Sequence, residues 1–198
     1  MKLLTSILLV AFASTTVLAS IDPQDITVQR DPTSQTLIVR TTIALDRAAA
    51  FTLTDADGRT IYTDSVGAGQ FVNKRFPLNA FPQRDYELTI SDRRGATTQP
   101  FRPHAQGGVT DRSQAQRLAY PRIDLRDERT LVVDYRNQSG KRVSIRLADQ
   151  AGNTVFSDKV EGTAVQRSYR LTNLDRGDYR VTVNGRDLKD YTTAIALR

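Results

Sequence analysis

An internal repeat constrains the fold of this 198-residue chain more than any other feature of its sequence. Residues 53–66 read LTDADGRTIYTDSV, and residues 147–160 read LADQAGNTVFSDKV. The two segments align without a gap at an offset of 94 residues, and after one residue is lost in the next loop the match continues at an offset of 93. The alignment keeps both the hydrophobic positions and the turn glycine. The sequence therefore predicts two copies of one structural unit.

Each copy carries the period-two pattern of half-buried β-strands. In the second copy, Val143, Ile145 and Leu147 alternate with Ser144 and Arg146, which places the two sets on opposite faces of a sheet. Between strands, DADGR and DQAGN supply the aspartate and glycine that tight hairpins favour. About six or seven short strands fit in each copy. The pattern predicts an all-β fold, with two tandem immunoglobulin-like antiparallel β-sandwich modules after a signal peptide.

Two tyrosines occupy equivalent places in the copies. Tyr86 and Tyr179 each begin a strand directly after a loop. Immunoglobulin-like folds place a corner tyrosine at such a position, and its hydroxyl bonds back to the backbone a few residues upstream. We expect both tyrosines to form this corner.

The repeat and the sequence between its copies predict four segments. Residues 1–19 form a signal peptide, 20–102 the first β-sandwich module, 103–119 a linker and 120–198 the second module. The linker prediction depends on PHAQGGVTDRSQAQRLA, which is polar, contains glycine and has no periodic pattern.

The first 19 residues have the features of a secretory signal peptide. Lys2 precedes an apolar run, and Val17 and Ala19 are small residues at positions −3 and −1 of a cleavage site. A membrane anchor is the alternative, but Ser and Thr interrupt a run already short for a span of roughly 20 apolar residues. The sequence predicts a secreted or cell-surface protein, with the periplasm as the alternative location. It predicts no transmembrane segment in the mature chain.

Composition bounds the chemistry of the mature chain. Cysteine is absent, so neither disulfides nor an N-terminal lipid-bearing cysteine is available, and the core must stabilise each module alone. Without residues 1–19 the chain has 27 basic and 22 acidic residues, a net charge of +5. These charges are spread along the sequence rather than clustered with aromatic residues, so we expect no nucleic-acid partner. An acidic glycan or a cell surface stays open as a partner.

Three short motifs offer candidate sites. Asp55, Asp57 and Gly58 form DxDG, a fragment of a calcium-binding loop. The second copy has Asp149, Ala151 and Gly152 there and so lacks the middle carboxylate, which favours a plain hairpin turn. The second motif, Arg176-Gly177-Asp178, spells the integrin-binding tripeptide RGD in a predicted turn, and turn geometry alone explains its glycine.

The third candidate is His104, the only histidine. It lies in the predicted linker without a nucleophile motif, where nothing would position a general base. We predict no enzyme activity, no catalytic residue, no metal site and no cofactor. Carboxylates paired across a sheet for glycoside hydrolysis are the enzymatic alternative, and the sequence cannot place such a pair.

The second copy resembles a known family of secretion modules. An apolar strand followed by D, two residues, G, two residues, an aliphatic and an aromatic, and later LxxGxY at Leu174, Gly177 and Tyr179, is similar to the C-terminal sorting domains of Bacteroidetes type IX secretion cargo. It also looks like small secreted β-sandwich families of unknown function from the same bacteria. Tyr120 and Pro121 stand where the sorting domain usually opens. The resemblance implies a seven-stranded sandwich that directs export across the outer membrane.

Two functions from different classes follow. The first is a non-catalytic secreted or cell-surface protein of tandem β-sandwich modules that acts in sorting, attachment or assembly at the cell envelope. Its candidate partners are secretion machinery or a cell-surface component. The alternative is an extracellular or periplasmic binding module that holds a glycan or a partner protein through loops at one end of a sandwich or through exposed aromatics.

Overall fold

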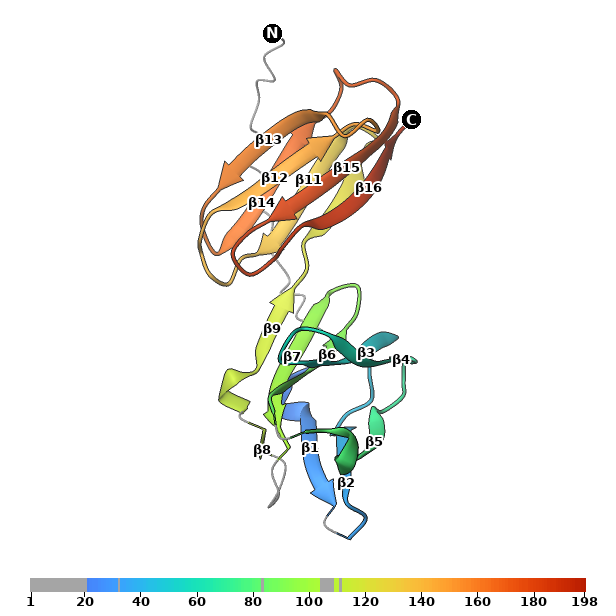
Figure 1. The fold of residues 1–198 in the computed structure, drawn as a ribbon. Helices are drawn as coiled ribbons and strands as arrows, with labels where there is room; N and C mark the ends of the chain where they lie inside the picture. The colour runs from blue at the N-terminus through green and yellow to red at the C-terminus, as the bar shows by residue number, and fades with distance from the viewer. Residues whose placement is uncertain (1–20, 32, 83, 104–108, 111) are drawn as a thin grey trace. The chain divides into compact units, whose positions relative to one another are not determined.

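The computed structural model describes residues 21–31, 33–82, 84–103, 109–110 and 112–198. The chain divides into two compact units between Ala119 and Tyr120 (Figure 1). We call the unit that ends at Ala119 the first module and Tyr120–Arg198 the second module. The division falls where the sequence predicts the second module to begin. Among the described residues, no helix is both long and apolar enough to cross a membrane.

The first module contains two antiparallel sheets, one with the strand order β1-β2-β5 and the other with the order β4-β3-β6-β7. A short 3-10 turn, η1, precedes the first strand, and a second, η2, follows the fifth. The elements are η1 (Pro23–Asp25), β1 (Ile26–Asp31), β2 (Thr36–Thr41), β3 (Ala49–Asp55), β4 (Thr60–Val66), β5 (Asn73–Pro77), η2 (Leu78–Ala80), β6 (Tyr86–Ser91) and β7 (Gly95–Arg102).

The second module repeats this arrangement strand for strand. Its sheets have the orders β10-β11-β14 and β13-β12-β15-β16, with every pair antiparallel. The strands are β10 (Arg122–Arg126), β11 (Thr130–Arg136), β12 (Val143–Ala148), β13 (Thr154–Val160), β14 (Ala164–Arg170), β15 (Gly177–Asn184) and β16 (Tyr191–Leu197). The hairpin β3–β4 and its counterpart β12–β13 even share a register irregularity near the turn, after Leu53 and after Leu147.

Alternating side chains build the core between the two sheets. In the first module, apolar residues from β1 and β2 pack in one cluster with apolar residues from β3 and β6. Phe51 and Leu53 of that cluster are fully buried, as are their counterparts Ile145 and Leu147. The seven strands that the modules share therefore form a three-on-four antiparallel sandwich of immunoglobulin-like type, which confirms the predicted fold class, and two further short strands extend the larger sheet of the first module.

The structure corrects the expectation of a linker over residues 103–119. Val109–Thr110 forms β8, Arg112–Gln114 a 3-10 turn (η3) and Gln116–Ala119 forms β9, and both strands pair antiparallel with β7. The approach is close, because a Cβ atom on Gly95 would lie 2.1 Å from the carbonyl oxygen of Leu118. A two-residue and a four-residue strand are too short to show periodicity, and they form because the edge of β7 offers unpaired backbone groups.

Candidate functional site

Asp55 of the DxDG motif serves the β3–β4 hairpin. Its side chain is buried, and Oδ1 accepts hydrogen bonds from the backbone N–H groups of Asp57 at 3.0 Å and Arg59 at 2.9 Å. Oδ2 accepts a hydrogen bond from Arg84 Nη2 at 3.0 Å. The bond from Arg59, with those from Asp57 and Arg84, lowers the pKa of Asp55. Gly58 has φ of 76°, which the turn requires. Protein donors thus occupy both carboxylate oxygens.

The second copy closes its hairpin in the same way. Asp149 accepts hydrogen bonds from the backbone N–H of Asn153 at 2.8 Å and from Asn153 Nδ2 at 3.1 Å, and these bonds lower its pKa. Gly152 has φ of 86°. Within the described ranges, no three His, Cys, Asp or Glu side chains are grouped closely enough to hold a metal ion. The conserved aspartate is a turn residue in both modules.

The two corner tyrosines form as predicted. Tyr86 donates its hydroxyl hydrogen bond to the carbonyl oxygen of Pro82 at 3.1 Å, and Tyr179 donates to that of Asp175 at 2.9 Å. In each case the acceptor lies four residues upstream, as the corner of immunoglobulin-like sandwiches requires. Both phenol rings are buried, so these bonds fix the loop that precedes the strand.

The other two candidate motifs do not form a site. Gly177 and Asp178 of the RGD tripeptide belong to β15 rather than to a turn, and Asp178 Oδ2 accepts a hydrogen bond from Gln150 Nε2 at 3.1 Å. Arg176 is exposed directly before the strand. His104 lies outside the described residues.

A carboxylate on the fourth strand of each module contacts the fifth strand in the facing sheet. In the first module Asp64 pairs with Lys74, and the hydroxyl of Tyr62 adds a hydrogen bond. In the second, Asp158 accepts a 2.8 Å hydrogen bond from the hydroxyl of Tyr169 and lies 3.6 Å from Arg167. These polar contacts join the two sheets where β4 faces β5 and β13 faces β14.

The outer side of the four-stranded sheet in the second module is strongly basic. Ser144 lies opposite both Lys159 and Asn184, Arg146 lies opposite Ser157 and Thr182, and Arg180 lies opposite Ala148. Since the alternate residues of β12 and β15 are buried, these side chains face outward. Three further cations lie in the loops at one end of this sheet. We call the six cations the basic face: Arg142, Arg146, Lys159, Arg180, Arg186 and Lys189.

Most cations of the basic face have no partner within the described part of the chain. Arg142 pairs with Glu161 at 3.0 Å, with both side chains exposed. Among the described residues, the side chains of the other five form no hydrogen bond or ion pair. Two bordering carboxylates accept hydrogen bonds from uncharged donors: Asp190 from Asn184 Nδ2 at 2.9 Å and Asp187 from the backbone N–H of Ser139 at 2.9 Å. The charge of the face is therefore directed to solvent.

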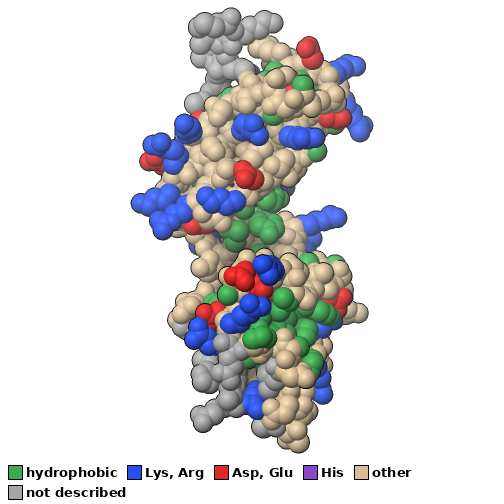
Figure 2. Space-filling view, viewed as in Figure 1, with side chains coloured by type: hydrophobic (Ala, Val, Ile, Leu, Met, Phe, Trp, Pro, Cys, Tyr) green, Lys and Arg blue, Asp and Glu red, His purple; other side chains and the backbone are tan. Residues whose placement is uncertain are grey.

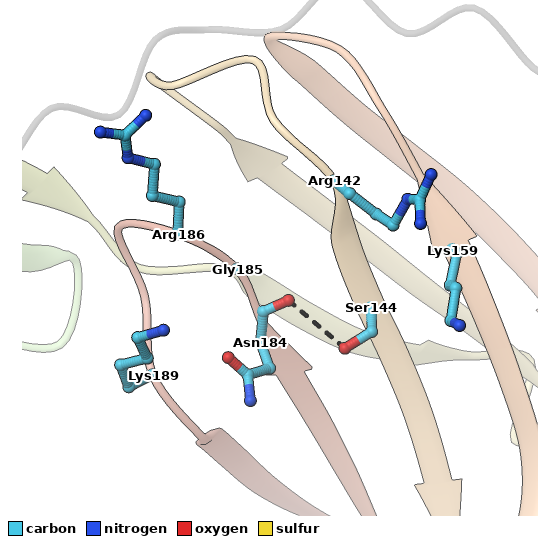
Figure 3. A pocket seen from close by; sticks show the side chains of 7 residues that line it. All are labelled: Arg142, Ser144, Lys159, Asn184, Gly185, Arg186 and Lys189. Carbon is cyan, nitrogen blue, oxygen red and sulfur yellow. Dashed lines mark hydrogen bonds between the residues drawn. The ribbon is translucent and has the colours of Figure 1, made fainter.

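A shallow hollow of about 340 Å³ lies within the basic face and opens widely to solvent. Its centre is the contact in which Ser144 Oγ donates a 3.4 Å hydrogen bond to the carbonyl oxygen of Asn184. Arg142 and Lys159 lie on one side of this contact and Arg186 and Lys189 on the other (Figure 3). The lining residues are Arg142, Ser144, Lys159, Asn184, Gly185, Arg186 and Lys189.

Three loops beside the hollow are tied together. Asn137 is 1% exposed and donates from Nδ2 to the carbonyl oxygens of Lys141 at 2.6 Å and Gly162 at 2.8 Å. The Asp187 contact to Ser139 joins the same region to the loop between β15 and β16. Leu188, which is 3% exposed, anchors that loop in the core. The loops thus hold Arg142, Arg186 and Lys189 on an ordered backbone.

The first module has the equivalent four strands without the strand cations of the basic face. Thr52 occupies the position of Arg146, Ser65 that of Lys159 and Glu87 that of Arg180. Its central cross-strand row consists of four threonines, Thr63, Thr52, Thr89 and Thr98. Sequence reasoning missed the basic face because it considered charge along the chain. A position-by-position comparison of the two copies reveals these cations.

Net charge follows the same division. Residues 21–119 contain 12 basic and 11 acidic side chains, whereas residues 120–198 contain 15 basic and 11 acidic ones. Several separate groups of Lys and Arg side chains lie on the visible side of the second module, with fewer Asp and Glu side chains among them (Figure 2). The second module therefore carries most of the excess positive charge, which favours attraction of anionic partners.

Comparisons with known proteins bear on the fold only weakly. No family model matches the chain, and no curated protein matches it. A solved structure described as "Biofilm associated protein - BSP domain" is similar over 87% of this chain at 14% identity with a TM-score of 0.31, and this chain covers 29% of it. A two-domain fibronectin type-III segment from chicken tenascin is similar over 88% of this chain and 97% of its own length, at 13% identity and a TM-score of 0.30. The fold assignment depends on strand order and register.

Proposed function

We propose that this protein is a non-catalytic component of the cell envelope, secreted or held at the cell surface, whose second module attaches it to an envelope component. The observation that carries the proposal is the basic face. It lies on a regular sheet, most of its cations have no partner among the described residues, and the equivalent sheet of the first module lacks it. Shared fold residues explain the repeat, so a change to basic residues at outward positions, which the core does not require, points to recognition.

Sorting by type IX secretion is the second candidate for the same module. It is favoured by the resemblance at Leu174, Gly177 and Tyr179, and by the division of the chain at Tyr120, which makes the module a transferable unit. A reporter fused between residues 1–19 and Tyr120–Arg198 tests it in a host that has the type IX machinery. Export of the reporter to the surface or the medium supports sorting. Retention of both the reporter and the intact protein in the periplasm would rule out sorting by type IX secretion.

Attachment is tested with the intact mature protein. Cells or isolated envelopes are incubated with purified protein, washed at low and high salt, and the bound fraction is measured. We expect retention that falls as salt rises, because exposed charges are screened beyond about 10 Å at 0.1 M ionic strength. No retention at low salt would contradict an attachment role.

A further inference from the structure

We propose that the basic face binds a carboxylated polysaccharide. The inference deepens the attachment function above and rests on it, since it names the chemical class of the partner. The occupant must be polyanionic, because Arg146, Lys159 and Arg180 project from three neighbouring rows of one sheet without a carboxylate partner among the described residues. Rows lie about 7 Å apart along a strand and neighbouring strands about 5 Å apart. Cations at this spacing suit a chain of repeating anionic groups.

The side chains between the cations suit a sugar. Ser144 and Asn184 share the row of Lys159, and Thr182 shares the row of Arg146. Hydroxyl and amide groups both donate and accept hydrogen bonds, as sugar hydroxyls also do. Arginine can meet a carboxylate with two parallel hydrogen bonds. The face therefore offers cations to the carboxylates of a uronic-acid polymer, and hydroxyl and amide groups to its hydroxyls.

Other anionic partners fit this face less well. Its outward strand positions carry Ser, Thr, Asn, Ala, Lys, Arg and Asp, with Val155 at the bulge of β13, and no aromatic side chain on which bases could stack. They also carry no large apolar side chain that could enter a lipid bilayer. The observations therefore favour a polysaccharide over a nucleic acid or an anionic membrane.

The backbone that carries the face is also fixed before binding. Arg146, Lys159 and Arg180 lie on strands, and Leu188 and Asn137 hold the loops that carry the other cations. A ligand that binds an ordered surface loses less free energy to ordering the protein. This arrangement favours measurable affinity from a modest number of contacts.

The test uses the full mature chain and alginate, a polymer of uronic acids, with neutral dextran as the uncharged reference. The face variant combines Arg146→Thr, Lys159→Ser and Arg180→Thr. We expect it to bind alginate about a hundredfold more weakly, because each lost charge-assisted contact weakens binding by about fivefold. Binding of the unaltered protein should weaken as sodium chloride is raised. Dextran should not bind.

A matched control removes the same number of charges elsewhere on the second module: Arg136→Thr, Arg170→Ser and Arg176→Thr. These side chains are exposed and lie outside the basic face. Circular dichroism confirms folding of both variants, and the milder pair Arg146→Gln and Lys159→Gln replaces the face variant if it unfolds. Equal losses in the face variant and the control would overturn the proposal, because net charge alone would then explain binding.

Two other results would also overturn it. One is the absence of salt-sensitive alginate binding by the unaltered protein. The other is tighter binding to a DNA duplex or to phosphatidylglycerol vesicles that is lost in the face variant, which would assign the face to another class of partner. These assays use purified protein, so failure here leaves the envelope-retention result intact. Retention without alginate binding would preserve attachment and reject a carboxylated polysaccharide.

Discussion

The two modules share a framework and differ most in charge on the outward side of one sheet. Both close the hairpin after the third strand with an aspartate and a glycine of positive φ, and both fix the loop before the sixth strand with a corner tyrosine. Outward positions of the four-stranded sheet diverge, from Thr and Ser in the first module to Arg and Lys in the second. The repeated residues specify the backbone, whereas outward positions that the backbone does not require differ between the copies.

The cores differ as well. In the first module, six aromatic rings form a continuous series of contacts, with centroid distances from 5.0 to 6.4 Å. The second module keeps the Phe156–Tyr169 contact at 4.5 Å and fills most other aromatic positions with aliphatic residues, for example Ile145 in place of Phe51. The sandwich thus tolerates exchange of core chemistry where the inward pattern is kept.

The prediction with the largest expected effect concerns β9, a strand that the second module lacks. Gly95→Ala places a Cβ atom 2.1 Å from the carbonyl oxygen of Leu118, so β9 must shift away from β7. We expect a loss of about 3 kcal/mol in the first module and faster amide exchange in Gln116–Ala119. Gly58→Ala is the control, because its Cβ meets nothing within 4 Å and only its φ of 76° costs about 1 kcal/mol. Equal losses would show that β9 is not closely packed.

The next effect is a difference in alkaline stability. Burial raises the pKa of Tyr135 to about 12, and burial together with Asp158 raises the pKa of Tyr169. An unfolded tyrosine titrates near 10, so above that pH the unfolded chain loses protons that the folded module keeps, and stability falls as pH rises. The first module has Thr41 and Phe76 at these positions.

Urea unfolding at pH 8 and pH 11 measures this difference. We expect Tyr135 to account for a loss of about 1 kcal/mol over that interval. The variant Tyr135→Phe should therefore show a smaller loss than the unaltered chain. The same pH dependence in both proteins would rule out Tyr135 as the cause.

A smaller effect is expected at the two corner tyrosines, and it shows whether they contribute equally to the stability of their modules. Tyr86→Phe and Tyr179→Phe each remove one hydrogen bond to a backbone carbonyl and leave the ring in place. We expect each to cost about 1 kcal/mol, which lowers the Tm of a domain of this size by roughly 4–8 °C. Calorimetry of both variants provides the comparison. A loss in only one module would mean that the corner is structural in that copy alone.

The smallest expected effect concerns the basic face itself. Arg146→Thr and Lys159→Ser introduce the residues that the first module has at these positions. Because neither side chain contacts a partner among the described residues, the free energy of unfolding should change by less than about 0.5 kcal/mol. Thermal unfolding checks this. A fall in Tm of many degrees would indicate that these cations serve the fold.

The sequence predicts the framework because framework residues leave periodic and repeated signals. Alternation around Ile145 and Leu147 predicts strands, and the shared positions of Tyr86 and Tyr179 predict the corners. β9 leaves no such signal, since its four residues pair only because β7 offers an open edge. The ion pair of Asp55 with Arg84 and the grouping of Arg146 with Arg180 join residues far apart in sequence. They depend on strand pairing that no single segment encodes.

The most direct test of a shared framework with a specialised second module is a residue-resolved binding map. Backbone amide chemical shifts of the full mature chain are followed by NMR during titration with a short oligouronate. We expect changes at the outward positions of β12, β13 and β15 and in the loops around Arg142 and Arg186, with none at Thr52, Ser65 and Glu87 of the first module. Changes centred on the first module, or none in either module, would contradict the account.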